Sequence, residues 1–155
     1  MTNHYHCIAN LIYQYANLVD AGDFEALGAL FEKGRIIYMP SGFEVKGGQS
    51  MTDHFARSVR LYPETGTPCT LHQVTNVAVD FADNDRRASA SSVFTVYQFA
   101  EGQPWQTICA GRYYDQFVFD KERWNFHERS VEPCYFGDMS RHIVEVEPVL
   151  RPVFG

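Results

Sequence analysis

The spacing of the apolar residues changes character once along this chain, near residue 70. Before that point apolar side chains recur at helical spacing, and after it they alternate with polar ones in long runs separated by short polar turns. Helices followed by a long antiparallel meander are typical of an α+β fold. With 155 residues and 45% hydrophobic side chains, the chain is long enough for one packed domain, which we expect to span residues 1–155.

The first half of the chain carries clear signals for where helices end and begin. Gly22 is a stop for the first helix, and Asp23 directly after it is a good N-cap for the second. Gly34 ends the second helix before a short β-prone run. The expected elements are helices over residues 8–19, 23–31 and 51–61 and a strand over residues 35–39.

The second half predicts four strands joined by short turns, over residues 70–81, 88–99, 105–119 and 123–131. Such strands form a strongly curved antiparallel sheet, and the N-terminal helices must cover its concave face because its apolar side needs burial. We therefore expect a cone that encloses a pocket. The C-terminal tail, residues 136–155, lacks periodicity and is expected to pack across the mouth of the cone or against a partner.

Composition excludes several classes of function. The net charge is −6, and the 13 basic residues form no cluster denser than Arg86 and Arg87, so we expect no nucleic-acid partner. No apolar run approaches the roughly 18 residues of a membrane span, and the N-terminus lacks a signal-peptide pattern, so we expect a cytoplasmic protein without membrane contact. Neither cysteine nor histidine spacing resembles a metal motif, so no metal is expected.

The aromatic content of 15% fits either an aromatic-rich core or a cavity for an apolar ligand.

Asp20, at the end of the first expected helix, and His72, on the first long strand, are the most suggestive pair. A carboxylate that orients an imidazole makes a general base, so the pair points to proton abstraction. Taken singly, Asp20 also fits a solvated helix end and His72 a hydrogen-bonded core residue. Strand alternation places Thr70, Val74 and Asn76 on the same face as His72.

The same alternation sorts the last two strands. On the third long strand we assign the face with Gly111, Tyr113 and Asp115 to the cavity. On the last strand Arg129 shares a face with His127 and Val131. Since a buried arginine normally needs a carboxylate or an anionic ligand, Arg129 fits either a pocket residue or a structural ion pair.

Several of these residues resemble the SnoaL-like branch of the nuclear-transport-factor-2-like superfamily. The resemblance covers roughly residues 5–135 and implies a cystatin-like cone. The stretches that carry it are Tyr15-x4-Asp20-Ala21-Gly22-Asp23-x6-Leu30-Phe31, Thr70-Leu71-His72 and Gly111-Arg112-Tyr113-Tyr114-Asp115-x8-Trp124-x4-Arg129.

Scytalone dehydratase, hexachlorocyclohexane dehydrochlorinase and a bile-acid dehydratase belong to this branch. By resemblance, Asp20 accepts the Nδ1 proton of His72 and leaves Nε2 free to remove a proton from carbon, while Tyr15 and Arg129 hydrogen-bond the substrate oxygen or the leaving group. Tyr15 stands where the dehydrochlorinase has a lysine, which favours loss of water over loss of chloride. The substrate pocket is expected to include Tyr38, Tyr97, Gly111, Tyr113, Asp115 and Val131.

The resemblance leaves alternatives open. Ketosteroid isomerase keeps a tyrosine and a protonated aspartate where Tyr15 and Asp115 stand, but Met39 occupies the position of its base. A non-catalytic binding protein and the small subunit of a ring-hydroxylating dioxygenase share the fold. Our first hypothesis is a cofactor-independent lyase of the dehydratase type that acts on a small hydrophobic, cyclic molecule and assembles as a homodimer or homotrimer.

Overall fold

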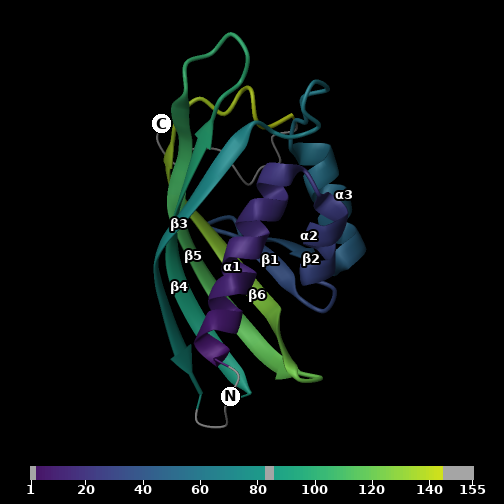
Figure 1. The fold of residues 1–155 in the computed structure, drawn as a ribbon, viewed down its shortest axis with the longest axis vertical. Helices are drawn as coiled ribbons and strands as arrows, with labels where there is room; N and C mark the ends of the chain where they lie inside the picture. The colour runs from purple at the N-terminus through teal and green to yellow at the C-terminus, as the bar shows by residue number, and fades with distance from the viewer. Residues whose placement is uncertain (1–2, 83–85, 145–155) are drawn as a thin grey trace.

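The computed structural model, described over residues 3–82 and 86–144, has three helices packed against one face of a six-stranded sheet (Figure 1). This confirms the predicted α+β class and the helical cover of the sheet. The described elements are α1 (His4–Ala21), α2 (Phe24–Leu30), β1 (Arg35–Tyr38), β2 (Phe43–Lys46), α3 (Gly48–Ser58), β3 (Thr70–Phe81), β4 (Arg87–Gln98), β5 (Gln106–Asp120) and β6 (Arg123–Phe136).

The turn between α1 and α2 forms as the sequence predicts and fixes the last turn of α1, which carries Asp20. Gly22 has a left-handed backbone with φ 70°, and its N–H bonds the carbonyl oxygens of Leu18 and Val19. Asp23 caps α2 by accepting a hydrogen bond from the backbone N–H of Ala26 at 3.0 Å. A side chain at Gly22 would come within 2.8 Å of the carbonyl oxygen of Gly66, so the turn also packs tightly against the loop after α3.

The sheet has the strand order β2-β1-β6-β5-β4-β3. All neighbouring pairs are antiparallel except β1 and β6, which are parallel. The predicted antiparallel sheet is therefore a mixed one. β2 pairs with the other edge of β1 as a hairpin. The sequence did not predict β2, because two of its four residues, Glu44 and Lys46, are charged and of types that are depleted in strands.

Two of the bulges in the sheet overturn strand faces that alternation predicts. The β3–β4 register shifts between Thr75 and Ala78, and Asn76, with φ 54°, lies exposed rather than on the face of His72. The β5–β6 register shifts between Gln116 and Phe117, and the bulge leaves His127 exposed while Arg129 points inward. In both cases one extra residue moves the remaining side chains of the strand to the other face.

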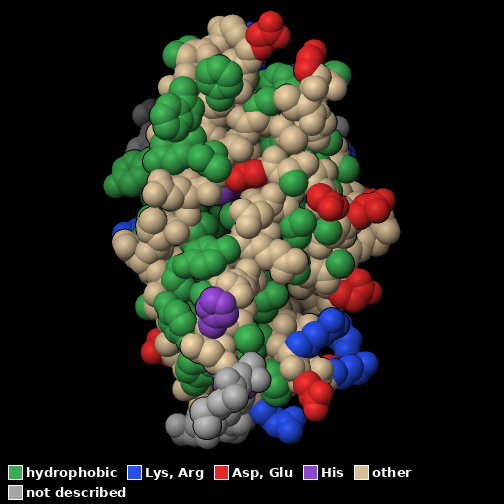
Figure 2. Space-filling model, viewed as in Figure 1, with side chains coloured by type: hydrophobic (Ala, Val, Ile, Leu, Met, Phe, Trp, Pro, Cys, Tyr) green, Lys and Arg blue, Asp and Glu red, His purple; other side chains and the backbone are tan. Residues whose placement is uncertain are grey.

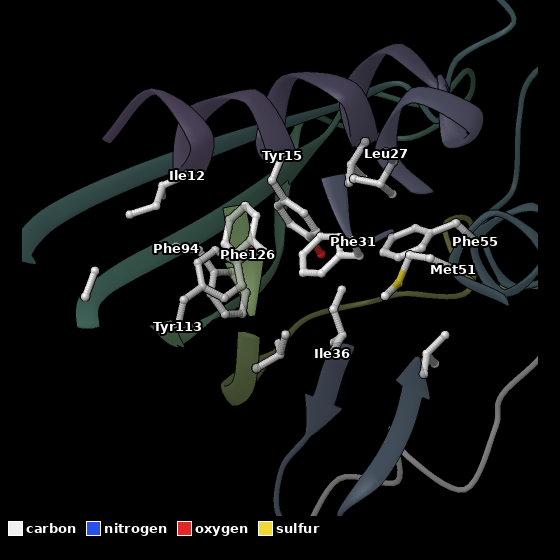
Figure 3. Packing of buried hydrophobic residues seen from close by; sticks show 14 of the residues in the cluster. Ile12, Tyr15, Leu27, Phe31, Ile36, Met51, Phe55, Phe94, Tyr113 and Phe126 are labelled. Carbon is white, nitrogen blue, oxygen red and sulfur yellow. The ribbon is translucent and has the colours of Figure 1, made fainter. Parts of the chain in front are cut away.

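Aromatic rings fill the space between α1 and the sheet (Figure 3). The rings of Phe94 and Tyr113 stack with centroids 4.4 Å apart, and those of Phe31 and Phe126 stack at 4.7 Å. The Tyr15 side chain extends from α1 toward the sheet and packs edge-on against the Tyr113 ring, with the two ring centroids 5.9 Å apart. Many of the aromatic residues therefore belong to a packed core.

Residues 137–144, here called the closing segment, turn back from β6 and lie beside the end of α3. Val59 and Ile143 form an isolated bridge, and the backbone N–H of Val144 donates to the carbonyl oxygen of Ser58 at 2.8 Å. β6 ends at Phe136, the first residue of the predicted tail. Residues 145–155 of the predicted tail lie outside the described residues.

Candidate active site

A cavity of about 120 Å³ lies between the helices, the inner face of the sheet and the closing segment. Its wall is mostly apolar, which suits a hydrophobic ligand. An apolar cavity of roughly 150 Å³ holds one benzene ring, so this slightly smaller space is of the scale of a single ring. The polar side chains among its lining residues include Tyr15, Tyr38, His54, His72, Tyr113 and His142.

Asp20 and His72 meet at the wall of this cavity. Asp20 Oδ1 lies 2.6 Å from His72 Nδ1, and Asp20 Oδ2 accepts the backbone N–H of His72 at 2.7 Å. The Thr70 hydroxyl also donates to Oδ1 at 2.8 Å. Both carboxylate oxygens are therefore held by the strand that carries the histidine.

This geometry assigns the tautomer of a neutral His72 ring. A carboxylate only accepts hydrogen bonds, so the ring proton sits on Nδ1 and Nε2 carries a free lone pair. The His72 side chain is 7% exposed and lines the cavity. The arrangement can accept a proton from a molecule bound there.

Arg129 does not line the cavity. Its Nε and Nη2 donate to the two carboxylate oxygens of Asp115 at 2.7 Å each, and both side chains are fully buried. The guanidinium carbon lies 4.2 Å from the centre of the Tyr15 ring and 4.0 Å from that of Tyr113. The two rings, which do line the cavity, lie against the guanidinium, so of the two alternatives for Arg129 the structure shows the ion pair.

The ion pair shapes the electrostatics of Tyr15. Burial raises the pKa of the Tyr15 phenol to about 12, and the nearby charge of Arg129 offsets part of that rise. Burial is the largest single influence on the pKa of Arg129 and lowers it, but Asp115, Tyr113 and Tyr15 together outweigh burial, so the pKa of Arg129 rises. Tyr15 is therefore a protonated hydrogen-bond donor at neutral pH.

The other predicted pocket residues fall in different places. Tyr38, Tyr113 and Val131 line the cavity, whereas Asp115 lies outside it with Arg129. Gly111 does not line the cavity but shapes it: a Cβ there would collide with the carbonyl oxygen of Glu132 and lie 2.9 Å from the Phe94 ring.

Tyr97 is not in the cavity. Its hydroxyl donates to Gln73 at 3.1 Å, and its ring lies 5.4 Å from that of Trp105. His72 pairs with Val96, and alternation along β4 turns Val96 inward and its neighbour Tyr97 outward.

Two histidines that the sequence gave no functional weight line the cavity. His54 is buried on α3, and its Nε2 lies 3.1 Å from the Tyr38 hydroxyl. The apolar stripe of Met51 and Phe55 on the same helix could have indicated that His54 faces inward. His142 lies in the closing segment, where no periodicity marks it.

Among residues 3–82 and 86–144, no group of three His, Cys, Asp or Glu side chains is arranged to hold a metal ion. None of the helices described in that part is long and apolar enough to cross a membrane. The cytoplasmic location stays a prediction from the sequence.

The sheet covered by helices on one face, with an apolar cavity between them, is the cystatin-like arrangement that the sequence predicts. Residues 1–130 match the family model of the SnoaL-like domain. The chain therefore belongs to the SnoaL-like family. A sequence search of curated proteins finds no match.

Solved structures show the same fold. A candidate scytalone dehydratase from Novosphingobium aromaticivorans is 22% identical with a TM-score of 0.69, over 97% of this chain and 93% of that one. An NTF2-like protein with a cystatin-like fold from the same species is 19% identical with a TM-score of 0.70, over 96% and 89%. ActVI-ORFA from Streptomyces coelicolor is 18% identical with a TM-score of 0.67, over 85% and 98%. At these identities the likeness establishes the fold alone.

Proposed function

We propose that this protein is a cofactor-independent lyase that eliminates water from a small hydrophobic, cyclic molecule. His72 is the general base and Asp20 orients it. The observation that carries the proposal is the 2.6 Å contact between Asp20 Oδ1 and His72 Nδ1 at the wall of an apolar cavity. The SnoaL-like family and the single-ring size of the cavity support it.

The reaction proceeds by proton removal and loss of hydroxide. His72 Nε2 takes a proton from a carbon beside a carbonyl, and the negative charge moves to the carbonyl oxygen. A carbon–carbon double bond then forms as this enolate collapses and the C–O bond of the next carbon breaks. The leaving hydroxide takes the proton of the Tyr15 phenol and departs as water. The proton on His72 then returns to Tyr15 through solvent. Asp20 stabilises the imidazolium, and such acid–base assistance is worth roughly 10² to 10⁴-fold.

Arg129 acts through Tyr15 in this scheme rather than on the substrate. Its positive charge, 4.2 Å from the centre of the Tyr15 ring, stabilises the phenolate that forms when Tyr15 gives up its proton. Asp115 holds the guanidinium in place. Arg129 is therefore a positioning residue.

The contacts of Asp115 do not favour the isomerase alternative. A ketosteroid-isomerase-like site needs a protonated carboxyl group that donates a hydrogen bond to the substrate. Both oxygens of Asp115 accept hydrogen bonds from Arg129, and the side chain does not line the cavity.

The test is the elimination of water from 3-hydroxycyclohexanone, a one-ring probe that carries the required carbonyl and hydroxyl. Formation of cyclohexenone is followed by its ultraviolet absorbance. His72→Ala should lower the rate by roughly 100-fold or more. His127→Ala, at an exposed histidine on the β6 bulge, is the matched control and should leave it unchanged. Turnover by wild type that survives His72→Ala would contradict the proposal.

An exposed apolar patch supports the proposed homodimer or homotrimer. Leu71, Phe99 and Trp105 are 59%, 69% and 65% exposed, and Figure 2 shows hydrophobic side chains gathered at the end of the molecule where β4 turns into β5. Contiguous patches of this kind mark interaction surfaces. Light scattering after size exclusion should give a dimer or trimer mass for wild type and a monomer for Trp105→Glu.

A further inference from the structure

His142 is held rigidly even though it lies in an irregular segment. Its backbone N–H donates to the carbonyl oxygen of Met139 at 2.9 Å, and its carbonyl accepts the N–H of Arg60 at 2.8 Å. The hydroxyl of Tyr62 donates to the carbonyl oxygen of the preceding residue, Arg141, at 2.8 Å. These bonds hold the backbone of His142, and the residue is 93% buried at the wall of the cavity that His72 also lines.

The surroundings of His142 define which of its ring nitrogens carries a proton. Nδ1 is shut off from solvent and has no hydrogen-bond partner among residues 3–82 and 86–144. A buried N–H without an acceptor costs about 1–3 kcal/mol, so we assign the proton of the neutral ring to Nε2, which is not among the side-chain atoms shut off from solvent without a partner. Burial, reinforced by His72 and opposed by Asp20, lowers the pKa of His142 to about 4. The ring is therefore neutral at physiological pH.

The two cavity histidines have complementary hydrogen-bonding roles. His72 is held with its proton on Nδ1 and presents a lone pair at Nε2, whereas His142 keeps its proton on Nε2. One ring can accept a proton while the other donates a hydrogen bond to the same bound molecule.

We propose that His142 is a second catalytic residue, which donates its Nε2–H to the substrate oxygen that becomes negative as His72 removes the proton. The inference rests on the proposed function and extends it. It requires a substrate with a carbonyl group beside the carbon that loses the proton. A neutral imidazole of low pKa stabilises the resulting enolate without giving up its own proton.

The first test measures whether the cavity prefers an enolate to a neutral ketone. Cyclohexane-1,3-dione, which ionises to a one-ring enolate in neutral buffer, is compared with cyclohexanone, and each dissociation constant comes from an NMR titration of the backbone amides. A hydrogen bond to a charged oxygen predicts that wild type binds the dione about tenfold more tightly or better. His142→Phe should reduce this preference to about threefold or less, and His142→Gln, which keeps an N–H donor, should retain part of it.

The second test needs no variant. Long-range ¹H–¹⁵N spectra of the histidine rings in wild type at about pH 6 should show a neutral His142 with its proton on Nε2, and the Nε2 signal should move when the dione is added. A proton on Nδ1, a charged ring at that pH, or an enolate preference unchanged in His142→Phe would overturn the inference. Both tests measure binding and are independent of the conversion of 3-hydroxycyclohexanone. If wild type prefers the enolate but does not convert 3-hydroxycyclohexanone, the proposed elimination is contradicted and the role of His142 is not.

Discussion

Removing the carboxylate from the buried ion pair should be among the most destabilising single changes in this protein. In Asp115→Asn the guanidinium of Arg129 stays fully buried but loses the partner that accepts two hydrogen bonds at 2.7 Å. Breaking a buried pair in this way costs about 3–5 kcal/mol of unfolding free energy, because an uncompensated charge remains inside. For a domain of this size that corresponds to a fall in Tm of roughly 6–20 °C.

Urea denaturation followed by circular dichroism measures the effect. Asp120→Asn is the matched control, because Asp120 pairs with Lys33 at 3.6 Å on the surface, with side chains 57% and 77% exposed, and should lose less than about 1 kcal/mol. The double variant Asp115→Leu with Arg129→Met removes both charges and should recover much of the stability. A loss below about 1 kcal/mol in Asp115→Asn would refute this reasoning.

Three further predictions concern His142, Gly111 and Tyr97. Between pH 6.5 and pH 4 the unfolded chain binds a proton at His142 that the folded protein does not bind. Lowering the pH across this window should therefore reduce the free energy of unfolding of wild type by about 3 kcal/mol more than that of His142→Gln, as measured by urea titrations. Equal losses in the two proteins would contradict the lowered pKa of His142. Gly111→Ala should lower the free energy of unfolding by about 1–3 kcal/mol, because the new methyl group collides with the Glu132 carbonyl and the Phe94 ring. An unchanged melting temperature would contradict this, because it would mean that the backbone of β5 moves to accommodate the methyl group. Tyr97→Ala should leave the dissociation constant of cyclohexane-1,3-dione unchanged within about twofold in the NMR titration, because the Tyr97 side chain lies on the outer face of the sheet. A large loss of affinity for the dione would contradict this placement of Tyr97.

Much of the fold follows from local sequence signals. The change from helical spacing to alternation predicts the α+β order, and the Gly22–Asp23 stop and cap predict the turn that positions Asp20. Two strand faces were predicted incorrectly because bulges, at Asn76 and His127, insert an extra residue. Alternation carries no information about where a bulge falls.

The candidate site was less predictable than the fold. Alternation placed Arg129 on the same face as Val131, but it could not show that two tyrosine rings would pack against the guanidinium. His142 lies in a segment whose position depends on long-range backbone hydrogen bonds to the chain after α3, which leave no local pattern. Tyr97 was assigned by resemblance, and the alternation of β4 alone would have placed it outside.

The central claim is that Asp20 and His72 form a general base at the cavity. The most direct test follows, by ¹H NMR, the exchange of the α-hydrogens of cyclohexanone for deuterium in D₂O. Wild type should exchange them faster than buffer, His72→Ala should fall to the buffer rate, and Asp20→Asn should lose roughly 100-fold or more. His127→Ala should match wild type, since its side chain is exposed on β6. Exchange at the wild-type rate in His72→Ala would contradict the account.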